Sequence, residues 1–121
     1  MEIKEPFIIM KIKKRNRIFE AGITKIKIKD CGLIQLKNNN QITFKSGKSE
    51  YDVCKKDWGY YATSSINGRL KKFRFRTFII SNDQKKIFIF LVHNNRMKLF
   101  KNYLKKEKNF IIKELTNFKK F

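Results

Sequence analysis

The 121-residue chain has few of the residues that build disulfides, metal sites or phosphate loops. Its two cysteines, Cys31 and Cys54, lie far apart and outside any CxxC or Cys/His cluster, so neither a disulfide framework nor a zinc site is indicated. The five glycines are isolated and form neither a GxGxxG nor a GxxxxGK motif, so a loop that holds nucleotide phosphates is not indicated. We therefore predict two reduced, buried cysteines, no metal and no cofactor.

Long apolar runs and linkers are also absent. No segment approaches the roughly 18 uninterrupted apolar residues of a membrane span, and the first five residues lack the apolar core of a signal peptide. These features predict a cytoplasmic protein without a membrane span. The length and the lack of a Pro- or Gly-rich linker predict one domain over residues 1–121, with a frayed tail at 116–121. The oligomeric state stays open, a dimer included.

Acidic residues are scarce. Ten Asp and Glu stand against thirty Lys and Arg, a net charge of +20. A basic surface is typical of proteins that bind phosphate groups. Lysine-rich composition also arises in AT-rich genomes whatever the function, so the positions of the charges, above all of the arginines, are more informative than their number.

Alternating apolar and charged residues fill the first half and predict strands. The pattern indicates an antiparallel meander with turns at 15–17, 30–32 and 38–40. The predicted strands cover residues 6–14, 23–29, 33–37, 41–45 and 50–54.

The second half predicts a hairpin of strands 74–80 and 86–92, followed by a helix. Residues 87–92 are apolar on both faces, so we expect this strand at the centre of the sheet. Met97, Phe100 and Leu104 recur at helical spacing and predict an amphipathic helix over 94–106, capped by Asn94 or Asn95. With a last strand at 110–115, the predicted fold class is α+β with a mostly antiparallel sheet.

Residues 52–77 carry the only Trp, two adjacent Tyr and a Ser-Ser pair. The spacing of Ile66, Leu70 and Phe73 predicts a short helix capped by Ser64 or Ser65. A helix start, an arginine fork and aromatic rings together suit an anionic ligand with a base or a sugar. The predicted ligand-binding residues are Trp58, Tyr60, Tyr61, Ser64, Ser65, Asn67 and Arg69. The alternative interpretation places the rings in the core, treats the serines as caps only and leaves Arg69 solvated.

Catalytic arrangements have little support. Cys54 and the only histidine, His93, lack an indicated third group, and Asp52, Asp57 and Asp83 are explained by ion pairs or turns. The sequence therefore predicts no catalytic residues and favours a non-enzymatic role.

The motifs EYDV (50–53), DWGYYAT (57–63) and SINGRL (65–70) precede two strands and a helix with Phe100 and Tyr103. This order resembles, over residues 23–115, a family of small bacterial proteins that accompany enzymes of surface-carbohydrate biosynthesis. The resemblance implies an accessory role in that pathway and supplies no catalytic residues. The chain departs from the family pattern at Ser64, where a proline is expected, and in its high positive charge.

Two functions of different classes follow. The first is a non-catalytic module that recognises an anion-bearing ligand, such as a sugar phosphate or nucleotide sugar, or docks on a surface-carbohydrate biosynthetic enzyme. The second is a nucleic-acid (RNA) binding protein whose basic sheet face comprises Lys25, Lys27, Lys29, Arg74 and Arg76. The first is favoured, because single-strand binding needs exposed rings on a basic face, whereas Ile and Phe here alternate with Lys as on a buried side.

Overall fold

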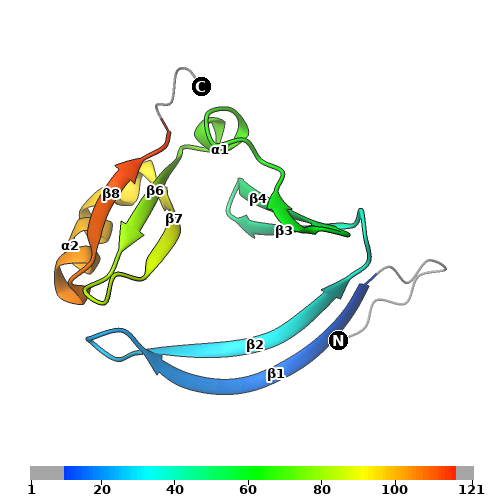
Figure 1. Cartoon of the computed structure of the whole chain (residues 1–121), viewed down its shortest axis with the longest axis horizontal. Coiled ribbons are helices and arrows are strands. Elements are labelled where there is room, and N and C mark those ends of the chain that lie inside the picture. Colours follow the sequence, from blue (N-terminus) through cyan, green and yellow to red (C-terminus); the bar gives the residue numbers. More distant parts are fainter. Residues whose placement is uncertain (1–9, 117–121) are drawn as a thin grey trace. The chain divides into compact units, whose positions relative to one another are not determined.

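Antiparallel strands make up most of the fold. The computed structural model describes residues 10–116 (Figure 1). Three sheets have the strand orders β1-β2, β3-β4-β5 and β7-β6-β8, which confirms the predicted α+β class. The elements are β1 (Met10–Ala21), β2 (Ile26–Leu36), β3 (Gln41–Ser46), β4 (Ser49–Lys56), β5 (Gly59–Ala62), α1 (Arg69–Lys72), β6 (Phe75–Ser81), β7 (Ile87–His93), the 3-10 helix η1 (Asn94–Arg96), α2 (Met97–Glu107) and β8 (Phe110–Glu114).

The contacts within the chain divide it into two compact units. Unit 1 comprises the residues up to Phe44 together with Asp52–Thr63, and it contains β1, β2 and β5. Unit 2 comprises Lys45–Tyr51 and the residues from Ser64 onward, and it contains both helices and the β7-β6-β8 sheet.

In unit 1, β1 and β2 are longer than predicted. β1 continues through the expected turn at 15–17, and β2 continues through the expected turn at 30–32. The pairing register shifts between Lys14 and Arg17, which is a β-bulge. Before the shift Ile12 pairs with Ile34, and after it Phe19 pairs with Ile28. Ile12 and Phe19 are seven residues apart and would face opposite ways in a regular strand, so the bulge brings both apolar residues to one face.

Asp30 stabilises this bulge. Its carboxylate lies 3.1 Å from Arg17 Nη2 and 3.4 Å from Arg15 Nε, and it accepts a hydrogen bond from the backbone N–H of Gly32 at 3.2 Å. A Cβ at position 32 would lie 2.8 Å from the carbonyl oxygen of Lys13, so the close approach of the two strands requires glycine. The turn predicted at 30–32 is therefore wrong, since these residues belong to β2.

The cysteines differ in burial. Cys54 is buried as predicted, but Cys31 is exposed. Cys31 shares a face of β2 with Lys27 and Lys29, because alternate residues of a strand point the same way. Its predicted burial is wrong for that reason.

In unit 2, α2 covers one face of the β7-β6-β8 sheet (Figure 1), as the helical spacing predicted. The helix begins at Met97 after η1, and its N-cap residue is Arg96 with no side-chain cap bond, so the predicted asparagine cap is wrong. The core between helix and sheet consists of buried Phe78, Ile80, Val92, Phe100 and Leu104, with Phe90 and Met97 packed against it.

The central strand of this sheet is β6. We predicted that residues 86–92 would occupy the centre, but β7 lies at an edge because β8 pairs with the other side of β6. Phe88 is 47% exposed and Ile89 is 59% exposed, so the apolar character of β7 does not reflect burial on both faces within this unit.

Thr116, the first residue of the predicted frayed tail, packs within unit 2. Thr116 is buried, and its hydroxyl accepts a hydrogen bond from the backbone N–H of Thr77 at 2.8 Å. The rest of the predicted tail, and residues 6–9 of the predicted first strand, lie outside the described residues. Between residues 10 and 116, the helices are too short or too polar to cross a membrane.

Candidate functional site

The seven predicted ligand-binding residues divide between the two units. Trp58, Tyr60 and Tyr61 belong to unit 1, whereas Ser64, Ser65, Asn67 and Arg69 belong to unit 2. Each half is therefore described by itself.

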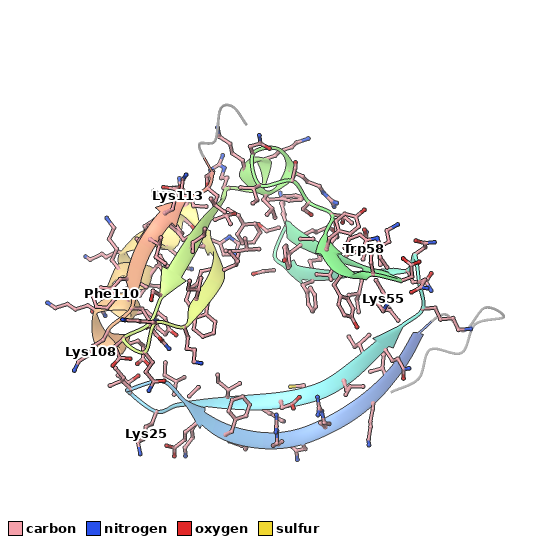
Figure 2. All side chains as sticks on the ribbon, in the orientation of Figure 1. Lys25, Lys55, Trp58, Lys108, Phe110 and Lys113 are labelled. Atoms are coloured by element: carbon pink, nitrogen blue, oxygen red, sulfur yellow. The ribbon has the colours of Figure 1, made fainter. Side chains whose placement is uncertain are left out.

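The aromatic half is exposed. Trp58 is 69% exposed, and Tyr60 and Tyr61 also present much of their surface to solvent. The interpretation that placed these rings in the core is wrong. Trp58 lies in the turn between β4 and β5, and Figure 2 labels it in the same part of unit 1 as Lys55.

The two tyrosines point to opposite faces of the β4-β5 pair. Tyr61 pairs with Cys54 and Tyr60 pairs with Lys55, and successive strand residues alternate between faces. The ring of Trp58 stacks on Tyr61, with 5.8 Å between ring centroids and 25° between planes. Trp58 and Tyr61 therefore form one platform, from which Tyr60 is excluded.

A lysine accompanies each tyrosine. Lys56 Nζ lies 6.0 Å from the centre of the Tyr61 ring and donates a hydrogen bond of 2.9 Å to Asn39 Oδ1. Lys55 Nζ lies 5.5 Å from the Tyr60 ring and donates to Asn38 Oδ1 at 3.2 Å. We call Trp58, Tyr61 and Lys56 the Trp58 face, and Tyr60 with Lys55 the Tyr60 face.

The asparagine loop places these lysines. The backbone N–H of Asn39 donates to the Lys55 carbonyl at 2.7 Å, and the N–H of Lys55 donates to the Asn40 carbonyl at 3.0 Å. Sequence reasoning treated 38–40 as a turn only and omitted Lys55 and Lys56. Their position between the predicted strand 50–54 and Trp58 was the signal that could have identified them.

The serine and arginine half does not form the predicted helix start. α1 has only four residues, its N-cap is Gly68, and Arg69 is its first residue rather than lying a turn further on. Ser65 Oγ does accept a hydrogen bond from the Arg69 N–H at 3.2 Å, but Ser64 is buried. The predicted cap by Ser64 or Ser65 at a longer helix is therefore wrong, because residues 66–68 form a turn instead.

Arg69 is engaged by its own unit. Its Nη2 lies 2.8 Å from Glu50 Oε1, and its guanidinium lies over the Phe73 ring at 5.6 Å. Ser49 Oγ donates to the Phe73 carbonyl at 3.3 Å, so two residues of β4 meet α1 at this point. Asn67 is exposed in the preceding turn. The guanidinium fork is thus used to hold β4 and α1 together.

The alternative basic face is also divided. Lys25, Lys27 and Lys29 lie in unit 1, and Arg74 and Arg76 lie in unit 2. Lys25 occupies the turn between β1 and β2 (Figure 2), in a left-handed conformation with φ of 53°. Lys27 and Lys29 are exposed on β2. In the register of the β1–β2 hairpin, Lys27 lies opposite Glu20.

Arg76 forms a bidentate ion pair with Glu114 of β8. Its Nε and Nη2 donate to Oε2 and Oε1 at 2.8 and 2.6 Å. The hydrogen bonds from Arg76 lower the pKa of Glu114 below its ordinary value of 4.5, against the opposing effect of burial. The carboxylate in turn raises the pKa of Arg76. This pair joins β6 to β8.

Acid should weaken this junction. Because folding lowers the pKa of Glu114, its ion pair contributes stability above pH 4.5, and that contribution is lost as the pH falls through the lowered pKa. We expect the free energy of unfolding of Glu114→Gln to fall less steeply than that of wild type as the pH drops below about 5, because the variant has no carboxylate to protonate at this position. Urea unfolding at several pH values measures this dependence. Asp83→Asn, in the exposed β6–β7 turn, is the control and should keep the wild-type slope. Parallel curves for wild type and Glu114→Gln would contradict the assignment.

Among residues 10–116, no group of three His, Cys, Asp or Glu side chains could hold a metal ion. His93 packs on Phe75, with 4.4 Å between ring centroids. Comparisons with family models, with curated proteins and with solved structures found no match. The resemblance to the small bacterial proteins of surface-carbohydrate biosynthesis stays a prediction.

Proposed function

We propose that the protein binds single-stranded nucleic acid, with RNA as the expected form, through the Trp58 face. The observation that carries this proposal is the exposed Trp58–Tyr61 stack beside the ammonium group of Lys56. Proteins that bind single strands combine exposed rings, on which bases stack, with cations that contact the phosphates. The Trp58 face has both parts within one short pair of strands.

The overall charge supports the same partner. A net charge of +20 attracts a polyanion more strongly than it attracts a single phosphate group, because many phosphates interact with the protein at once. The objection raised from the sequence was that the basic strands lacked exposed rings. Trp58 and Tyr61 are exposed rings, although they lie in the β4–β5 hairpin rather than beside Lys25, Lys27 and Lys29 of the β1–β2 hairpin.

Single strands suit this geometry better than duplexes. The outer surface of a stacked ring pair can take another aromatic ring, but bases inside a duplex already stack on each other and present only their edges. The anion site predicted at α1 has less support, because Arg69 bonds Glu50 and α1 spans only four residues.

Trp58 is the only tryptophan, so its fluorescence reports directly on the proposed site. We expect an oligouridine of about ten nucleotides to quench it, a length within the usual site sizes. Tyr61→Ala should weaken binding by about 1–3 kcal/mol, the usual contribution of one base–ring stack. Tyr60→Ala is the matched control, since it removes an identical ring from the adjacent position on the opposite face, and it should bind like wild type.

Salt dependence provides the second measurement. Lys56→Ala should reduce the slope of log affinity against log salt by about 0.7, the value for one phosphate contact on a single strand. Equal losses for Tyr60→Ala and Tyr61→Ala, or an affinity without quenching of Trp58, would place the nucleic acid elsewhere and overturn the proposal.

A further inference from the structure

A second candidate site lies in unit 2, apart from the residues of the Trp58 face. A cavity of about 320 Å³ opens where the end of α1, the start of β6, the start of η1 and the end of β8 meet. Phe75 forms part of its wall. Its polar lining comprises Lys71, Arg74, Arg76, Asn94, Glu114 and Thr116.

The charges of the lining favour an anion. Three cations and one carboxylate line the cavity, which leaves a net charge of +2. The carboxylate of Glu114 is neutralised by its two hydrogen bonds from Arg76, and Thr116 also hydrogen-bonds Glu114. Arg76 and Glu114 therefore act as a fixed wall, and the excess positive charge belongs to Lys71 and Arg74.

The backbone around Arg74 is held on both sides. Its N–H donates to the Lys71 carbonyl at 2.9 Å, and its carbonyl accepts from the Asn94 N–H at 2.8 Å. Arg74 directly follows the C-cap of α1 in a left-handed conformation with φ of 66°. These hydrogen bonds join the backbones of Lys71, Arg74 and Asn94, which all line the cavity. The fold therefore fixes the Cα positions of these three residues.

We propose that this cavity binds a phosphate monoester. A guanidinium offers a planar pair of donors that matches two phosphate oxygens, an ammonium adds a point charge, and the side-chain amide of Asn94 adds a neutral hydrogen bond. The volume is within the range of small-ligand pockets, so it can hold a phosphate with an attached sugar. The monoester could be carried by a free sugar phosphate or by the terminal phosphate of a nucleic acid.

The test exploits the left-handed backbone at Arg74. Arg74→Gly removes the guanidinium and puts at this position the residue that adopts such a conformation without strain. The matched control is Lys108→Gly, which removes one positive charge from the left-handed C-cap of α2, outside the cavity lining (Figure 2). The probes for calorimetry are ribose 5-phosphate, inorganic phosphate and ribose.

We expect wild type to bind ribose 5-phosphate and not ribose. Arg74→Gly should weaken that binding by about tenfold to a hundredfold, because it removes a guanidinium that hydrogen-bonds the phosphate. Lys108→Gly removes a charge that does not contact the ligand, so its affinity should stay within about twofold of wild type. Lys71→Ala, on the exposed side of α1, provides an independent second loss if Arg74→Gly does not fold. Equal losses for Arg74→Gly and Lys108→Gly, or no preference of wild type for ribose 5-phosphate over ribose, would overturn the proposal.

A further arm distinguishes the two sources of the phosphate. An oligouridine with a 5′-phosphate is compared with the same oligouridine without it, on wild type and on Arg74→Gly. An advantage of the 5′-phosphate that Arg74→Gly removes assigns the cavity to a nucleic-acid end, and equal binding of the two oligonucleotides assigns it to a free phosphate ester. Failure of the Trp58 face would leave the ribose 5-phosphate result unchanged, because the Trp58 face and the cavity share no residue.

Discussion

Phe78→Ala should lower the free energy of unfolding by about 3–5 kcal/mol, the usual cost of deleting a buried phenylalanine ring. Phe78 is 2% exposed at the centre of the unit 2 core. Its ring centroid lies 5.3 Å from that of Phe100, and the Arg76 guanidinium lies over the ring at 5.3 Å. The substitution therefore removes contacts to α2 and to the ion pair of β6 with β8, and urea unfolding followed by circular dichroism measures the loss.

Ile89→Ala is the matched control on the neighbouring strand. Ile89 is largely exposed on the edge strand β7, so its truncation should change stability by no more than about 0.5 kcal/mol. Similar losses for the two variants would mean that β7, rather than β6, lies at the centre of the core.

The same experiment tests the predicted single domain. The only tryptophan, Trp58, lies in unit 1, whereas Phe78 and the longer helix lie in unit 2. If the chain unfolds as one domain, Phe78→Ala should shift the fluorescence and circular dichroism transitions equally. A shift in circular dichroism alone would show that the units unfold separately.

Asp52→Ala should lower the free energy of unfolding of unit 1 by about 1.5–3 kcal/mol, the range for hydrogen bonds to charged groups. Asp52 is fully buried in β4, and its Oδ1 accepts a hydrogen bond from Thr43 Oγ1 of β3 at 2.6 Å. Its backbone carbonyl also accepts from the Thr63 N–H at 3.0 Å. Loss of the carboxylate leaves the Thr43 hydroxyl without this acceptor, and Trp58 fluorescence during urea unfolding reports the change.

Asp57→Ala is the control, because it removes the same charge from an exposed turn and should be nearly neutral. A double-mutant cycle with Thr43→Val isolates the bond itself, with an expected coupling of about 0.5–3 kcal/mol. A coupling near zero would show that Asp52 stabilises unit 1 through other contacts.

Local patterns predicted most elements of the fold. The spacing of Met97, Phe100 and Leu104 identified α2, and alternation identified most strands. The turn expected at 15–17 is explained by the bulge, since the extra residue in β1 changes which residues share a face and the strand no longer looks continuous. The turn expected at 30–32 came from the turn-forming residues Asp30 and Gly32, although β2 continues through them. The two-faced apolar pattern of β7 misled because an exposed apolar edge strand and a buried central strand have the same composition.

The candidate site was predicted only in part. Trp58 and Tyr61 were named from the sequence, but Lys56 and Asn39 were not. Asn39 is distant in the sequence and reaches Lys56 only through the pairing of residues 39 and 40 with Lys55. Arg69 was named as a ligand group, but Glu50 engages it, a partner that is near only after β4 meets α1.

By itself, the sequence determined the positive charge, the α+β class, the amphipathic helix and the concentration of aromatic residues around Trp58, because these depend on composition and on periods of two or 3.6 residues. Only the tertiary structure decided that β6 is central, that Arg76 is paired with Glu114, and that Tyr61 joins Trp58 while Tyr60 does not. Those outcomes depend on strand order, register and pairing between distant residues, for which a local pattern carries no information.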